Sequence, residues 1–288
     1  MAGAVAEDLP AGDPTGAAVG GLPASASIVA RQSGVVAGLV GVQIALDEVS
    51  NRLGTGRASV QLAVDDGDQV GPGTVLGELT GPADTLLAAE RTVLNLLTHL
   101  SGIATLTAAS VAAVAGTGAV IRDTRKTLPG LRVLEKYAVR CGGGSNHRMS
   151  LSDAILVKDN HIAALGGVKR AVEAARHQAD LESARRQADG RAPGEPLALE
   201  VEVDTLAELD EALAAGAGLV LVDNMTLEDT AEAVRRAKQH GAEVEASGGL
   251  TLGKMKAVAA CGVHYLAVGA LTHSAPALDI GLDWRMNI

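Results

Sequence analysis

Basic side chains gather in one stretch of an acidic chain. Between Ile121 and Asn160 there are eight Lys or Arg and four Asp or Glu residues, a local charge of 8 − 4 = +4 in a chain whose formal net charge is −10. An acidic protein repels anions, so an anionic ligand needs such a cluster. Arg132 and Lys136 are expected on the solvent face of a helix that Pro129 begins. The other members predict a pocket for a small polyanion, because Arg matches carboxylates: Arg122, Arg125, Lys126, Arg140, Arg148 and Lys158.

Polar or glycine residues stand at the ends of six short apolar runs, at 119–122, 154–158, 197–203, 218–223, 242–246 and 265–269. In β/α barrels the active site is built at the carboxyl ends of the strands. Strands that simply stop where polarity begins would explain some of these positions. They would not explain Lys, Glu and Asp directly after fully apolar runs. The residues so placed are Asp123–Lys126, Lys158, Glu202, Asp223, Ser247–Gly249 and Gly269.

Two glycine-rich segments allow the backbone to approach a ligand. The first, Cys141–Arg148, is weak evidence, because a glycine run also caps a helix. The second, Ser247–Thr251, lies between an expected strand and an expected helix, so its N–H groups can hold a phosphate at the helix N-terminus. Val268, Gly269 and Ala270 on the next strand would complete that phosphate site.

The chemistry-bearing residues need a scaffold, and the pattern around them predicts an α/β fold. The six apolar runs alternate with amphipathic segments, which predicts a parallel sheet covered by helices. Six strands are fewer than the eight of a closed barrel, so an open or incomplete barrel is expected. Residues 83–115 carry apolar side chains at helical spacing and predict one long helix or two. Residues 25–81 are interpreted as short strands and turns, 1–24 as a loosely ordered arm, and 180–196 as a surface insertion.

Composition argues against several classes of protein. The chain has no Phe, one Trp and two Tyr, so it lacks the aromatic side chains on which single-stranded nucleic acids stack. Cys141 and Cys261 have no C-x-x-C spacing, which fits a reducing compartment. No signal peptide and no membrane span are expected. We therefore expect a cytoplasmic protein with neither nucleic acid nor membrane as partner.

Taken together, the motifs are similar to those of the quinolinate phosphoribosyltransferase family. The resemblance runs from about Glu7 to Trp284. In chain order the motifs are AERTVLNLLTHLSGIAT (89–105), RDTRKTLPGLR (122–132), GGGSNHR (142–148), ILVKDNHI (155–162), LEVEVDT (199–205), LVDN (221–224), SGGL (247–250) and VGALTHS (268–274).

The resemblance implies a domain plan and a reaction. It implies an N-terminal α/β sandwich domain at 1–103, an open α/β barrel at 104–273, and a tail at 274–288 that packs back on the N-terminal domain. It also implies a homodimer, or a higher oligomer, in which each site borrows residues from its neighbour. The reaction joins quinolinate to phosphoribosyl pyrophosphate, with Mg²⁺, and gives nicotinate mononucleotide, pyrophosphate and CO₂ for NAD synthesis.

The same resemblance assigns roles to residues. Arg91 is expected to reach across the dimer to a quinolinate carboxylate, and Lys158 to contact quinolinate or the donor. Glu202 and Asp223 are expected to face the ribose and Mg²⁺, with Lys126 and Lys158 as catalytic cations beside them. The quinolinate pocket would also hold Thr124, Arg125, Lys126, His147 and Arg148; the phosphate site would hold Ser247, Gly248, Gly249, Val268, Gly269 and Ala270.

One departure from the family and three alternatives stand beside this interpretation. The EDLPAGDPTG segment (7–16) begins almost at residue 1, so the family's leading helix is expected to be shortened. A relative that transfers phosphoribosyl to another acceptor is the first alternative. A Schiff-base aldolase using Lys158 is the second. A carrier module is the third, suggested by DGDQVGPG (66–73), although no Lys precedes Lys126.

Overall fold

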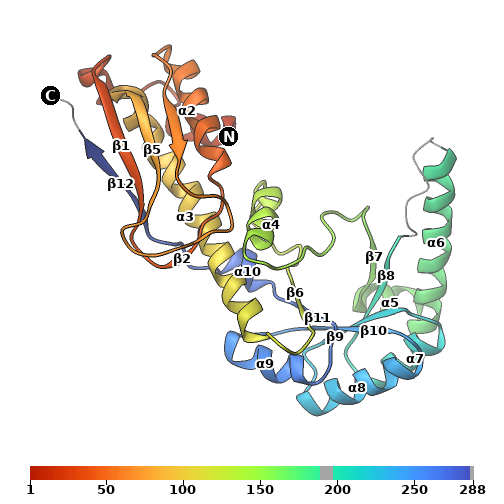
Figure 1. Ribbon diagram of the computed structural model, residues 1–288. Coiled ribbons are helices and arrows are strands. Elements are labelled where there is room, and N and C mark those ends of the chain that lie inside the picture. The colour runs from red at the N-terminus through yellow and green to blue at the C-terminus, as the bar shows by residue number, and fades with distance from the viewer. Residues whose placement is uncertain (189–196, 286–288) are drawn as a thin grey trace. The chain divides into compact units, whose positions relative to one another are not determined.

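The computed structural model describes residues 1–188 and 197–285, and it divides into two compact units (Figure 1). The first unit contains Met1–Ala108, Val133–Gly143 and the chain from Leu271 onward. The second contains Ala109–Arg132 and Gly144–Ala270. The domain boundary expected after residue 103 falls inside helix α3 (Ala83–Ala113), which runs without a break through that position.

The first unit is built on an antiparallel four-stranded sheet. Its strand order is β12 (Ile280–Arg285), β1 (Pro23–Ala30), β5 (Val75–Pro82) and β3 (Ser59–Leu62). The C-terminal strand β12 thus pairs with the first strand, from Ser25↔Arg285 to Ala30↔Ile280. Side chains of β1 and β5 form one aliphatic core with those of α2 (Val40–Leu53) and α3. A two-stranded sheet joins β2 (Gly34–Val35) to β4 (Gln69–Val70).

Two expectations for this unit were wrong. Residues 1–24 are not only a loose arm, because Ala2–Asp8 form α1 and Gly16–Val19 form a 3₁₀ turn. Val5 and Leu9 are buried in the core, and that burial explains why the short helix is held. Residues 25–81 contain α2 as well as strands. Its buried residues recur at helical spacing: Val42, Ala45, Leu46 and Val49.

Helix α3 is one continuous helix of 31 residues. It is long and apolar enough to cross a membrane by length and composition. The core helix of a globular unit meets the same test, and Leu86, Leu97 and Ile103 are buried. We interpret α3 as the core helix of the first unit.

Helix α4 (Arg132–Cys141) corrects the interpretation of two basic residues. Lys136 is fully buried, as is the neighbouring Glu135, which hydrogen-bonds His99 Nε2 at 2.9 Å. Arg132 is half-buried and donates to Thr127 Oγ1 and to the carbonyl of Met149. Neither side chain lies on a solvent face. A charged residue on a helix surface is normally exposed, but tertiary partners reverse that preference here.

The second unit is a parallel six-stranded sheet, which confirms the predicted open α/β barrel. The strand order is β6-β11-β10-β9-β8-β7, with β6 and β7 as the edge strands. Each strand coincides with one of the six predicted runs, and β10 extends one residue beyond its run. The strands are β6 Val120–Arg122, β7 Ile155–Val157, β8 Leu199–Val203, β9 Leu219–Asp223, β10 Glu243–Ser247 and β11 Tyr265–Ala267.

Helices follow the strands and cover the sheet (Figure 1). They are α5 Asp159–Leu165, α6 Val168–Ala188, α7 Leu206–Ala214, α8 Leu227–Gln239 and α9 Leu252–Ala260, with the short α10 (Ala270–His273) after β11. The insertion expected at 180–196 begins as the end of α6, and 189–196 lie outside the described residues. Because all six strands are parallel, their carboxyl ends meet at one edge of the sheet.

Candidate active site

A cavity of about 360 Å³ opens at the carboxyl ends of the strands. Nine of the predicted site residues line it, together with Leu156, Leu221, Glu245 and Ala267. The prediction that strand ends converge on one pocket is therefore realised in the geometry. The nine are Thr124, Arg125, Lys126, His147, Arg148, Lys158, Glu202, Asp223 and Ser247.

A buried aspartate fastens one wall of this cavity. Asp123, which follows β6 directly, is fully buried and accepts hydrogen bonds from Asn146 Nδ2 at 2.6 Å and from His147 N at 2.9 Å. A parallel bridge between Arg122 and Ser145 adds backbone bonds next to it. The second half of the glycine-rich loop is thereby tied to the edge strand. Its first half only caps α4, because Gly143 has a φ of 83° and donates to Arg140 O.

The basic wall consists of two arginines held close together. Burial lowers the pKa of Arg148, and the nearby positive charge of Arg125 lowers it further. Arg125 Nε is buried without a hydrogen-bond partner within the part of the chain that the structure describes. A buried donor in that state is costly unless a ligand satisfies it. Two adjacent guanidiniums, one with an unused donor, suit a planar diacid.

The acidic wall consists of two carboxylates from neighbouring strands. Glu202 of β8 accepts a hydrogen bond from Lys158 Nζ, and Asp223 ends β9, where it accepts from Asn224 Nδ2 at 2.7 Å. Glu202 pairs with Leu221, so Asp223, two residues further along β9, lies on the same face of the sheet and diagonal to Glu202. Two carboxylates are hard oxygen donors of the kind Mg²⁺ takes when it arrives with a phosphorylated substrate. The donor set therefore fits Mg²⁺ in a site that substrate completes.

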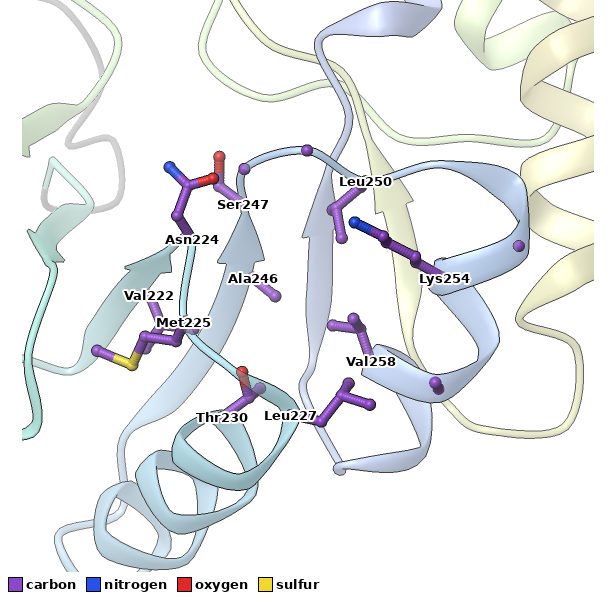
Figure 2. A pocket seen from close by; sticks show the side chains of 14 residues that line it. Val222, Asn224, Met225, Leu227, Thr230, Ala246, Ser247, Leu250, Lys254 and Val258 are labelled. Carbon is purple, nitrogen blue, oxygen red and sulfur yellow. The ribbon is translucent and has the colours of Figure 1, made fainter.

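A second cavity of about 400 Å³ lies behind the Ser247–Gly249 loop (Figure 2). Gly248 has a φ of 95°, and a Cβ there would stand 2.3 Å from Asn224 Oδ1, so the loop requires glycine. Lys254 of α9 points into the same cavity, a cation that the sequence analysis did not single out. The predicted phosphate residues divide at this point. Ser247, Gly248 and Gly249 line the cavity, whereas Val268, Gly269 and Ala270 line neither of these two cavities.

Arg91 is not among the residues that line the strand-end cavity. It is exposed on α3, which belongs to the first unit at that position. Its expected contact with quinolinate requires a second copy of the chain, so the fold of a single chain does not test this prediction.

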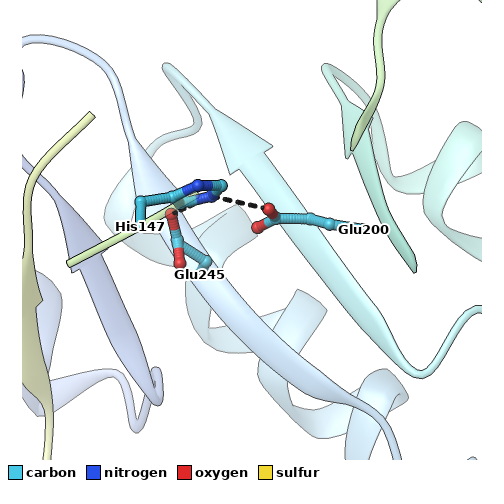
Figure 3. A group of neighbouring side chains, drawn as sticks. All are labelled: His147, Glu200 and Glu245. Atoms are coloured by element: carbon cyan, nitrogen blue, oxygen red, sulfur yellow. Dashed lines mark hydrogen bonds and ion pairs between the residues drawn. The ribbon is translucent and has the colours of Figure 1, made fainter. Parts of the chain in front are cut away.

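Two buried glutamates at this cavity were not predicted from the sequence, and one of them, Glu245, lines it. Glu200 of β8 and Glu245 of β10 flank His147 (Figure 3). Glu200 Oε2 lies 2.8 Å from His147 Nε2, and Arg122 NH1 donates to Glu245 Oε2 at 2.8 Å. Burial, and then the charge of Glu200, raise the pKa of Glu245 to about 7. The sequence contains a signal for them. In LEVEV (199–203) and EVEA (243–246) Glu alternates with Val, so the Glu side chains lie on one face of each strand and the Val side chains on the other.

His147 lines the cavity and makes two hydrogen bonds within the protein. Its Nδ1 accepts the backbone N–H of Arg148 at 2.8 Å, while Nε2 faces Glu200. Both ring nitrogens are thus engaged inside the protein. His147 contributes to the cavity wall, and its hydrogen bonds run to Arg148 and to the buried carboxylate.

These features define a class of enzyme. Basic side chains and two carboxylates at the strand ends of an α/β barrel, beside a glycine loop that opens a helix, form a site for an anionic substrate and a phosphate. Residues 13–101 match the quinolinate phosphoribosyl transferase N-terminal domain, and residues 103–283 match the C-terminal domain of the same family. The chain belongs to the quinolinate phosphoribosyl transferase family.

Individual relatives agree with that assignment. The chain is 48% identical over 265 residues to the nicotinate-nucleotide pyrophosphorylase [carboxylating] of Mycobacterium leprae, covering 91% of this chain and 87% of the relative. It is 42% identical over 282 residues to a probable enzyme of the same name from Bacillus subtilis, covering 98% and 91%. The solved nicotinate-nucleotide pyrophosphorylase of Francisella tularensis superposes with a TM-score of 0.84 at 35% identity, covering 98% of this chain and 94% of that one.

Proposed function

We propose that the chain transfers phosphoribosyl from phosphoribosyl pyrophosphate to quinolinate, with loss of CO₂, and so makes nicotinate mononucleotide for NAD synthesis. One observation carries the proposal. A single cavity places paired guanidiniums, one with an unused donor, opposite two carboxylates. That arrangement suits a diacid on one side and an electron-poor sugar on the other.

The basic wall supplies binding and orientation. Quinolinate carries two adjacent carboxylates on a planar ring, and Arg125 and Arg148 can each take one through paired hydrogen bonds. Lys126 and Thr124 line the same cavity. Orienting the ring nitrogen toward the ribose carbon converts the encounter into a positioned reaction.

The acidic wall supplies charge for the transition state. As pyrophosphate leaves, positive charge develops on the ribose carbon and ring oxygen, and Glu202 and Asp223 stabilise it electrostatically. Lys158, hydrogen-bonded to Glu202, holds that carboxylate in place and adds a cation toward the departing phosphates. Mg²⁺, when bound with the donor, would neutralise pyrophosphate charge.

Decarboxylation needs little further machinery. Once the ring nitrogen is glycosylated it carries a positive charge, which stabilises the carbanion-like carbon left when the adjacent carboxylate departs as CO₂. A proton then replaces the carboxylate. No group in the cavity has to act as a strong base.

Incubating the protein with quinolinate and phosphoribosyl pyrophosphate, and measuring CO₂ and nicotinate mononucleotide, tests the proposal. Equal amounts of both products, abolished by a chelator and restored by Mg²⁺, are expected. Product from another acid with none from quinolinate would favour a relative with a different acceptor. A borohydride-trapped adduct at Lys158 with carbonyl substrates would instead favour the aldolase alternative.

We also propose that the chain forms a homodimer in which each active site takes residues from both chains. We propose further that the protein resides in the cytoplasm. Arg91 is exposed on α3, and an anionic ligand in the basic cavity could take one more guanidinium from a neighbouring chain. Arg91→Ala and Lys126→Ala proteins should each be nearly inactive. Mixed so that hybrids form, they should regain activity, because one site of each hybrid combines intact Arg91 with intact Lys126. Verified hybrids without recovery would refute the shared site, and cell fractionation would test the compartment.

A further inference from the structure

Two buried carboxylates, Glu200 and Glu245, lie at the cavity in addition to Glu202 and Asp223, and Glu245 lines it. Glu200 and Glu245 are 4% and 0% exposed, and they come from β8 and β10. Their oxygens and a ring nitrogen of His147 lie within 4.8 Å of one another (Figure 3). Burying two carboxylates side by side is costly, so their position requires an explanation beyond packing.

The hydrogen bonds of His147 identify its tautomer. The backbone N–H of Arg148 points at Nδ1, so Nδ1 must be the acceptor and cannot carry a proton. The proton therefore resides on Nε2, which donates to Glu200 Oε2 at 2.8 Å. Glu245 Oε1, at 3.6 Å from the same nitrogen, lies too far for a second good hydrogen bond.

We propose that Glu200 is a positioning residue of the diacid pocket, acting through His147 on Arg148. Its carboxylate keeps the proton on Nε2 and fixes the ring plane, and the ring's Nδ1 in turn fixes the Arg148 backbone. This follows the general behaviour of histidines whose outer nitrogen is bonded to a carboxylate, where the partner fixes tautomer and orientation. The inference rests on the proposed function only for the identity of the ligand.

The fixed backbone matters because of where the Arg148 side chain is held. Its NH1 donates to the carbonyl of Ala154 at 3.0 Å, so one edge of the guanidinium is occupied within the protein. Backbone and side-chain bonds together leave the group little freedom to turn. Without the Glu200 acceptor, the opposite tautomer would place Nδ1–H against the Arg148 N–H, and that clash would displace the arginine.

The other contacts in the cluster support a positioning role for Glu200. Arg122 bonds Glu245 and stacks 3.2 Å above the Tyr265 ring, so Glu245 has its own cation. Glu200 has none at hydrogen-bond distance other than His147, and its Oε1 is without a hydrogen-bond partner among the described residues. Its carboxylate is thus committed to the histidine.

The test compares two substitutions of the full-length protein. Glu200→Leu removes the acceptor, whereas Glu200→Gln keeps an acceptor oxygen and removes the charge. We expect the leucine variant to raise the KM for quinolinate by about tenfold, the loss typical of a buried group left unsatisfied, and to leave the KM for phosphoribosyl pyrophosphate unchanged. The glutamine variant should recover most of the quinolinate KM. Glu211→Leu, at an exposed glutamate on α7, is the matched control and should change neither KM.

A spectroscopic measurement on the unaltered protein keeps the inference testable if Glu200→Leu does not fold. In ¹⁵N-histidine-labelled protein, with His147→Asn used only to assign the signal, His147 should show the Nε2–H tautomer. An Nδ1–H tautomer would overturn the inference, as would equal rises in both KM values or a glutamine variant as impaired as leucine. The tautomer measurement does not depend on activity toward quinolinate, so failure of the proposed function would be seen separately from failure of this inference.

Discussion

Glu200 and Glu202 stand two residues apart on β8 and share one face of the strand, yet their surroundings differ. Glu200 pairs with His147 where the side chains are 5% and 11% exposed. Glu202 pairs with Lys158 where they are 15% and 43% exposed. A step of two residues, roughly 7 Å along a strand, moves the carboxylate from the interior of the barrel to its open edge.

The difference shows how depth along one strand sets what an acid can do. At the deep position a carboxylate meets fixed partners, and its contribution is to geometry. At the shallow position water and a ligand can both reach it, and its charge can respond to a reaction. The opposite face of the strand carries Val201 and Val203, both buried, and they anchor the strand in the sheet. We therefore expect substitutions at the shallow pair, Glu202 and Lys158, to affect turnover. Substitutions at the deep cluster, Glu200, Glu245 and His147, should affect stability and the position of Arg148.

The largest effect should come from the shallow pair. Lys158→Ala should lower kcat/KM by an amount equivalent to roughly 2–5 kcal/mol, because a ligand-facing charge is lost. The unfolding free energy should change little, since Glu202 remains partly solvated at the cavity edge. Steady-state kinetics and urea unfolding measure the two quantities. Lys169→Ala, an exposed lysine on α6, is the control and should alter neither.

A large loss of stability in Lys158→Ala with an unchanged kcat/KM would contradict the assignment of the shallow pair to turnover. It would place the working residues deeper in the barrel than the strand-end cavity.

The deep cluster should make the unfolding free energy depend on pH. Glu245 has a pKa raised to about 7 from 4.5, chiefly by burial, so the folded state holds that proton more tightly than the unfolded state. The resulting stability is complete below pH 4.5 and is lost as the pH rises through 7. Glu245→Gln lacks this loss. Relative to wild type it should gain up to roughly 3 kcal/mol in unfolding free energy between pH 5 and pH 8.

Urea unfolding of both proteins at the two pH values measures that gain, and the subtraction cancels groups that both proteins share. Glu200, His147 and Arg122 face Glu245 in both proteins. A difference between the proteins that stays the same at pH 5 and pH 8 would contradict the deep assignment.

The barrel was predictable from the sequence because its strands are continuous apolar runs, and their polar ends mark the cavity. Lys158 and Asp223 were found by that rule. Glu200 and Glu245 were not found, because the rule considers the ends of the runs and these two residues lie within them. The assignment of Lys136 to a solvent face was wrong because the burial of a charge depends on partners distant in the chain.

Helix α2 escaped prediction for a different physical reason. Val40, Val42, Ile44 and Leu46 alternate with small or polar residues, which is the period of a strand. The structure exposes Val40 and Ile44 and buries Val42 and Leu46, so tertiary packing selects the helical period. Arg91 marks the other limit, because a residue expected to serve a second chain cannot be tested by the fold of one chain.

A position just beyond the same strand gives the smallest expected effect. Thr205 lies two residues after the end of β8 and is the N-cap of α7. Its side chain accepts from Glu208 N, and the Glu208 carboxylate accepts from Thr205 N. Thr205→Ala should lower the unfolding free energy by about 1 kcal/mol, the usual cost of losing such a cap. It should leave kcat/KM unchanged, because the cap holds the helix and not the ligand. Thr205→Ser, which keeps the hydroxyl, should restore stability. If instead turnover fell while stability held, the working edge of β8 would extend beyond Glu202 to the start of α7.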